Sequence, residues 1–182
     1  MMESNDSTDR GRAQPPRTSR SPGAARWDRA EYQRLWLRME SRAWRTLAVV
    51  PAEEDLSTYE VARLIMSLGV HHGESIGLFD FRDVMLNNAL AIVRAACAQM
   101  GRDERLIFAA RSVKENLATV PLARAMDGVV LCASIGSTSI GLLEETIEQI
   151  GKDRFVGSIL VRRPPAPPPS GSLTLRRRGL ES

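Results

Sequence analysis

The stretch that decides the fold is Thr46-Leu47-Ala48-Val49-Val50-Pro51-Ala52-Glu53-Glu54-Asp55-Leu56-Ser57-Thr58. Its first five residues are apolar or β-branched, which predicts a buried strand. A short acidic loop follows. Ser57 and Thr58 are then suited to cap a helix, which we expect to run from Thr58 to Gly69. Strand, short loop and helix in this order begin a βαβ unit.

The same alternation continues along the rest of the chain. Strands are expected at 75–81, 105–110, 129–134 and 155–161, and helices at 84–100, 117–126 and 140–150. Continuous apolar runs such as 128–133 are typical of a sheet that helices cover on both faces. The sequence therefore predicts a three-layer α/β fold with a mostly parallel sheet of about five strands.

Changes in composition divide the 182 residues into three parts. Residues 1–26 are poor in apolar side chains, so we expect a disordered N-terminal tail. Residues 27–163 form the α/β domain with a leading amphipathic helix. Residues 164–182 begin with a proline run and are rich in arginine, which predicts a second disordered tail.

The distribution of charge indicates what kind of partner the chain could bind, and its cysteines indicate in which compartment it lies. The net charge is only +3, but arginine gathers at both ends of the chain. That pattern favours an acidic protein surface or the cytoplasmic leaflet as a partner, unless the tails are simply solvated. The two cysteines, Cys97 and Cys132, lie in apolar runs and are expected to be buried and reduced, as in the cytoplasm. No apolar run approaches the roughly 18 residues that a membrane span needs.

The acidic loop after the first strand has the frame of a phosphate-binding loop without its chemistry. Such a loop uses glycines to wrap an anion with backbone N–H groups, and a lysine to reach the outer phosphates. Here Glu53 and Asp55 stand at glycine positions and Leu56 at the lysine position. Acidic residues lack the positive-φ freedom of glycine, and with Glu54 they repel a polyphosphate. We therefore expect no useful affinity for Mg-ATP.

Several motifs make residues 31–163 resemble a known family, the cytoplasmic tyrosine-kinase-like ATPases of bacterial capsule and exopolysaccharide synthesis. These belong to the MinD/ParA branch of P-loop proteins. Their phosphate loop ends in P-G-E-G-K-S-T, over which the present loop keeps Glu54, Ser57 and Thr58. Downstream, Ala125–Leu131 resembles the family segment A-D-G-V-[LI]-L-V, and Gly157–Val161 resembles its last strand.

The family motifs that hold ATP and magnesium are degenerate in this chain. The second motif, [LI]-[LI]-D-x-D-x-R, keeps Asp80 but has Arg82 at the second aspartate. The third motif supplies a metal-organising aspartate, whereas 106–112 contain no acid. The C-terminal tyrosine cluster is also absent, since the only tyrosines are Tyr32 and Tyr59. The resemblance thus implies an ancestral ATPase or tyrosine kinase that has lost its catalytic residues and cofactors.

What the resemblance implies about function is a non-catalytic scaffold or regulator. It would lie in the cytoplasm, peripheral to the inner membrane, on a polysaccharide chain-length or export protein. A homo- or hetero-oligomer with a related ATPase is a further expectation, and nucleic acid is not an expected partner. The leading helix supplies the partner-binding candidates, because in relatives it contacts a neighbouring subunit or the membrane partner, although it could instead pack on its own sheet. These candidates are Tyr32, Arg34, Trp36 and Arg38.

Two alternatives remain open from the sequence. One is a divergent but active ATPase or autokinase that uses Ser57, Thr58 and Asp80. The other is a ParA/MinD-like positioning factor that binds DNA or membrane through its arginine-rich tails.

Three polar positions also have plain structural interpretations. His71-His72 is expected in an exposed loop between a helix and a strand, Ser139 as a helix cap, and Asp80 as a capping remnant.

Overall fold

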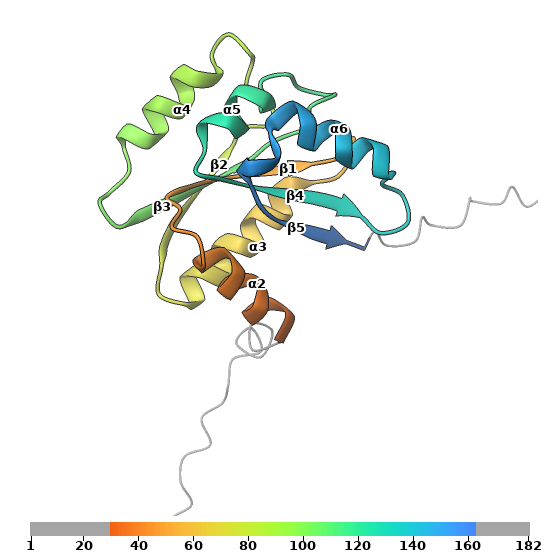
Figure 1. Ribbon diagram of the computed structural model, residues 1–182. Helices are drawn as coiled ribbons and strands as arrows, with labels where there is room; N and C mark the ends of the chain where they lie inside the picture. The colour runs from red at the N-terminus through yellow and green to blue at the C-terminus, as the bar shows by residue number, and fades with distance from the viewer. Residues whose placement is uncertain (1–29, 163–182) are drawn as a thin grey trace, which may run out of the picture.

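The computed structural model describes residues 30–162 (Figure 1). The expected tails, 1–26 and 164–182, lie outside the described residues. The elements follow the order α2 (Ala30–Glu40), β1 (Thr46–Pro51), α3 (Thr58–His71), β2 (Ser75–Asp80), α4 (Ala89–Ala98), β3 (Glu104–Ala109), α5 (Thr119–Ala125), β4 (Gly128–Ser134), α6 (Ile140–Ile150), a 3-10 turn at Lys152–Arg154 and β5 (Phe155–Val161). Strand and helix alternate as the sequence predicts.

The strands of residues 30–162 form one parallel sheet with the order β2-β3-β1-β4-β5. Every residue of β1 and β4 is buried, which explains why these two strands read as unbroken apolar runs. The predicted α/β class and the five strands are confirmed.

Helices cover both faces of the sheet, so the fold has three layers (Figure 1). Leu47 and Val49 of β1 pack with Ile65 on the side of α2 and α3. The alternate residues Ala48 and Val50 face α4, α5 and α6. This period of two along β1 divides the core into its two halves.

Several helix boundaries differ from the prediction, and two of the differences have a clear structural cause. The helix expected at 84–100 begins only at Ala89, because Asn116 holds the preceding loop by donating from Nδ2 to Val84 O at 2.9 Å. The helix expected to end at Gly69 continues to His71. Gly69 is needed inside the helix because a Cβ there would overlap Ile76 and lie 2.9 Å from Cη2 of Trp36.

The turn after α3 uses a different glycine and leaves both histidines exposed. Gly73 has φ +88°, a conformation that favours glycine. His71 is the last residue of α3, and His72 follows it with its ring stacked on Trp36 at 5.3 Å between centroids. The expected exposure of the pair is confirmed, but the expected loop position was wrong for His71, because α3 continues to that residue.

Candidate functional site

The carboxyl ends of parallel strands meet at one edge of the sheet, where open α/β folds place their ligands. Four loops gather there, at 52–57, 81–88, 110–118 and 135–139. They contain every residue that the sequence related to phosphate or metal chemistry, except Thr58 at the start of α3 and Asp80 at the end of β2.

The loop after β1 has the backbone of a tight strand-to-helix turn. Leu56, at the lysine position, is only 9% exposed and packs in the core. Asp55 adopts φ 62°, so the expectation that an acidic residue would deny this loop a positive φ was wrong at that position. Aspartate is one of the few L-residues that tolerate the left-handed region, because its side chain can hydrogen-bond locally.

Glu53 points across to the loop after β4. Its carboxylate accepts hydrogen bonds from Thr138 Oγ1 at 2.8 Å, Ser134 N at 3.2 Å and Ser137 Oγ at 3.2 Å. The carboxylate of Glu53 therefore occupies hydrogen-bond donors of the loop after β4. The partnership was missed from the sequence, since the serine-rich segment 134–139 was assigned only a capping role for Ser139. That cap is confirmed, because Leu142 N donates to Ser139 Oγ at 3.3 Å.

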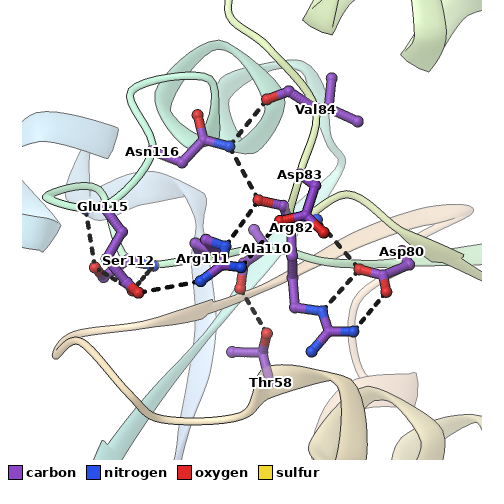
Figure 2. Close-up of polar contacts among 10 residues, drawn as sticks. All are labelled: Thr58, Asp80, Arg82, Asp83, Val84, Ala110, Arg111, Ser112, Glu115 and Asn116. Carbon is purple, nitrogen blue, oxygen red and sulfur yellow. Dashed lines mark hydrogen bonds and ion pairs between the residues drawn. The ribbon is translucent and has the colours of Figure 1, made fainter.

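The Ser-Thr pair that opens α3 is not arranged around a ligand. Thr58 is fully buried, and its Oγ1 donates to Ala110 O at 2.5 Å (Figure 2). Ser57 is exposed and takes the N-cap position without a side-chain capping bond. The Thr58 hydroxyl thus connects the start of α3 to the first residue after β3.

Asp80 forms a bidentate ion pair with Arg82, two residues along the chain (Figure 2). Hydrogen bonding to the Arg82 guanidinium holds the pKa of the Asp80 carboxyl below its usual value. The same guanidinium lies 5.1 Å from the ring centroid of Tyr59 in α3. The expected capping role of Asp80 was wrong, because α4 starts at Ala89, well beyond its reach.

A second arginine, Arg111, links the loops that follow β2 and β3. It donates from Nη2 to Asp83 Oδ1 at 2.9 Å and from Nε to Arg82 O at 3.1 Å. Asn116 adds a bond from Nδ2 to Arg82 O at 3.2 Å (Figure 2). Arg111 therefore joins the loops after β2 and β3. The position of the metal-organising acid in the resembled family is taken by Ala109.

Ser112 and Glu115 close the same network by bonding each other reciprocally. Ser112 Oγ donates to Glu115 Oε2 at 2.8 Å, and Glu115 N donates to Ser112 Oγ at 3.2 Å. The S-x-x-E spacing of a capping box was the sequence signal that could have revealed this pair.

At this edge of the sheet, acidic side chains form ion pairs with arginines of the same protein. Asp80, Asp83 and Glu115 each have an arginine partner. Among residues 30–162 no three acidic, histidine or cysteine side chains are placed to hold a metal ion together. Asp80, the surviving motif acid, and its neighbours Asp83 and Glu115 are thus used in ion pairs within the protein.

The four partner-binding candidates of the leading helix α2 differ in how far they are buried. Trp36 is 1% exposed, so its proposed availability to a partner was wrong. The indole packs against α3 at Gly69 because that position has no side chain. Arg34 and Arg38 are exposed. Tyr32 borders an open groove of about 970 Å³ between α2, α3 and β5.

Comparison with known proteins supports the fold. No family model matches the chain, and no curated protein matches it in sequence. Eleven chains of known structure match its fold. One of them, titled "BceF Tyrosine Kinase Domain", superposes with a TM-score of 0.50 at 11% identity, over 69% of this chain and 71% of that one. At this identity the likeness shows the fold alone, which is α/β and P-loop-NTPase-like.

Every helix within residues 30–162 is too short or too polar to cross a membrane.

Proposed function

We propose that the protein is a non-catalytic pseudokinase or pseudo-ATPase of bacterial exopolysaccharide synthesis. It acts as a cytoplasmic scaffold or regulator of an inner-membrane polysaccharide co-polymerase. The family context rests on the motifs of the sequence and on a fold shared with a tyrosine kinase domain.

The single observation that supports the loss of catalysis best is the Asp80–Arg82 pair. Both oxygens of the one motif carboxylate that survives accept from a guanidinium, at 2.8 and 2.6 Å. A divalent cation at Asp80 would have to displace Arg82 or lie beside its positive charge, and either costs electrostatic free energy.

Two further contacts support the same proposal. Glu53 uses its carboxylate on the loop after β4 and places negative charge where polyphosphate would lie. Leu56 replaces a phosphate-binding lysine and is packed in the core, so no simple change of rotamer would bring a cation to that position.

The proposal is tested by complementing a deletion strain and measuring its surface polysaccharide. Ser57→Ala removes an exposed hydroxyl that makes no capping bond, so the fold should be kept. A scaffold should restore polysaccharide to the wild-type amount with this variant. An enzyme that uses Ser57 would lose most of its activity, and a failed rescue by well-expressed Ser57→Ala would reject the non-catalytic proposal.

A further inference from the structure

The helix α4 is apolar around its whole circumference but is only partly covered. Arg94 is the one charged residue of Ala89–Ala98, and the others are alanine, leucine, isoleucine, valine and cysteine. A helix that is apolar on all sides is usually buried on all sides. In α4 only Ala89 and Val93 are buried. The uncovered side of α4 is therefore a candidate contact surface.

Four large apolar side chains near the start of α4 are exposed. They are Met85 (70%), Leu86 (55%) and Leu90 (43%), together with Leu117 (63%) in the loop before α5. The hydrogen bond from Asn116 Nδ2 to Val84 O at 2.9 Å holds the two loops together, so these side chains gather at one end of the helix. Exposed apolar patches commonly mark binding surfaces.

A groove of about 410 Å³ lies between α4 and α5, which cover the same face of the sheet (Figure 1). It is lined by Leu90, Val120, Pro121, Arg124 and Ala125. Among residues 30–162, this lining contains one cation and no acid.

A second cation lies beside the groove. Arg94 is one turn along α4 from Leu90, on the same side of the helix, and is exposed. None of the ion pairs in the described part of the chain involves Arg94. The groove therefore combines an apolar floor with two arginines, Arg94 and Arg124, and is complementary to an apolar partner that carries negative charge.

The shape and charge of the groove favour one kind of partner over two others. Anionic lipid is usually recognised by a cluster of about four to eight basic residues, whereas this surface has Arg94 and Arg124. A second copy that packed α4 against α4 would bring Arg94 close to Arg94, and such like-charge contacts are unfavourable. A concave apolar groove between two helices fits the apolar stripe of a third helix.

We infer that the groove between α4 and α5 binds an amphipathic helix of another protein that carries carboxylates beside its apolar stripe. The apolar stripe lies between Leu90 and Pro121, and the carboxylates face Arg94 and Arg124. This surface is on the face of the sheet opposite α2 and α3. It goes beyond the proposed function and does not depend on whether the protein binds nucleotide.

The test uses the full chain and two designed helical peptides. Both peptides carry leucines at positions i, i+3, i+4 and i+7, and the flanking positions are glutamates in one and lysines in the other. In fluorescence anisotropy at low salt, the acidic peptide should bind about tenfold or more tightly than the basic one. This preference should shrink as salt is added. Equal binding of the two peptides, or no binding of the acidic one, would overturn the inference.

Two substitutions locate the binding surface. Leu90→Ser removes an apolar contact and Arg94→Glu reverses a charge, and each should raise the Kd of the acidic peptide by about tenfold. Arg94→Glu should also tighten binding of the basic peptide, which a general loss of structure would not do. Leu160→Ser on β5 and Lys152→Glu in the 3-10 turn are matched exposed controls and should leave both Kd values unchanged. Weakening by the controls equal to that by Leu90→Ser would contradict the assigned surface.

The two other occupants are tested with the same variants. Cosedimentation with vesicles of phosphatidylcholine and phosphatidylserine measures binding to lipid, and sedimentation velocity measures self-association. Leu90→Ser should change neither measurement. Vesicle binding that Leu90→Ser abolishes would assign the surface to a membrane, and a dimer that it disrupts would assign the surface to a second copy. Either result would overturn the inference.

Discussion

Arg82 donates two hydrogen bonds to Asp80 at the carboxyl end of β2, from Nε to Oδ1 at 2.8 Å and from Nη2 to Oδ2 at 2.6 Å (Figure 2). Fork-to-carboxylate pairing of this kind uses both oxygens of the acid. Arg82 stands at the position of the second aspartate in the resembled motif. Arginine at position 82 therefore replaces a potential metal ligand and also neutralises the charge of the neighbouring Asp80.

The first prediction concerns this pair. Arg82→Gln should raise the pKa of Asp80 toward its ordinary value, because the largest cause of the depression is the hydrogen bond from Arg82. The two side chains are 35% and 42% exposed, so the loss of stability at neutral pH should be small, about 0.2–1 kcal/mol. Carboxyl NMR titration and urea unfolding measure the two effects.

The pH dependence follows from the sign of the shift. The pKa of Asp80 is lower in the folded state, so the pair stabilises the protein above the unfolded pKa near 3.8 and loses this effect as pH falls through the folded pKa. Wild type and Arg82→Gln should therefore converge in stability at acid pH. Arg63→Gln, which breaks the exposed Glu60 pair, should leave the titration of Asp80 unaltered.

The second prediction concerns Glu53. Glu53→Ala should destabilise the protein by about 1–3 kcal/mol, because Thr138 Oγ1 loses its charged acceptor at a partly buried site. Ser134 N also loses its bond to Glu53 but keeps its bond to Thr138 Oγ1 at 2.7 Å. Glu148→Ala, on the exposed face of α6, should change the stability by no more than about 0.5 kcal/mol. Equal denaturation midpoints for the two variants would show that Glu53 has no structural role.

The third prediction compares two helical glycines. Gly69→Ala should destabilise by about 1–3 kcal/mol, since the new methyl group meets Ile76 and Trp36 in the α2–α3 contact. Gly141→Ala in α6 meets nothing within 4 Å and should stabilise by about 0.5–1 kcal/mol. Thermal unfolding of both variants measures the difference. A stabilised Gly69→Ala would mean that α2 does not pack on α3 as described.

The fourth prediction concerns the two thiols. Burial raises the pKa of Cys132 to about 12 and also raises the pKa of the half-buried Cys97. In the native protein a thiol reagent at mildly alkaline pH should therefore modify Cys97 slowly and Cys132 only after unfolding. Cys97→Ser should remove the native reaction. Rapid labelling of that variant would contradict the burial of β4.

The sequence predicted the fold well because its strands are long, apolar and separated by clear helical patterns. β1 and β4 were placed within one residue at each end, since a strand buried on both faces leaves an unbroken apolar run. Asp127, in the segment Ala125–Leu131 that resembles the family, has a structural role. Its Oδ2 accepts hydrogen bonds from Arg45 N and Thr46 N at 2.9 Å and so joins the starts of β1 and β4.

The site was only partly predictable, because its contacts join loops that are distant in sequence. Replacement of the glycines and lysine could be read directly, but the bond from Thr138 to Glu53 spans 85 positions. The position of Trp36 was missed for a similar reason. Helical spacing gives the apolar face of α2, but the bare backbone at Gly69 decides how deeply its indole is buried.

The most direct test of the central claim is a calorimetric titration of the full chain with Mg-ATP. The arrangement of Glu53, Leu56 and the Asp80–Arg82 pair predicts heats no larger than dilution up to millimolar nucleotide. Saturable binding with a micromolar Kd would contradict the account.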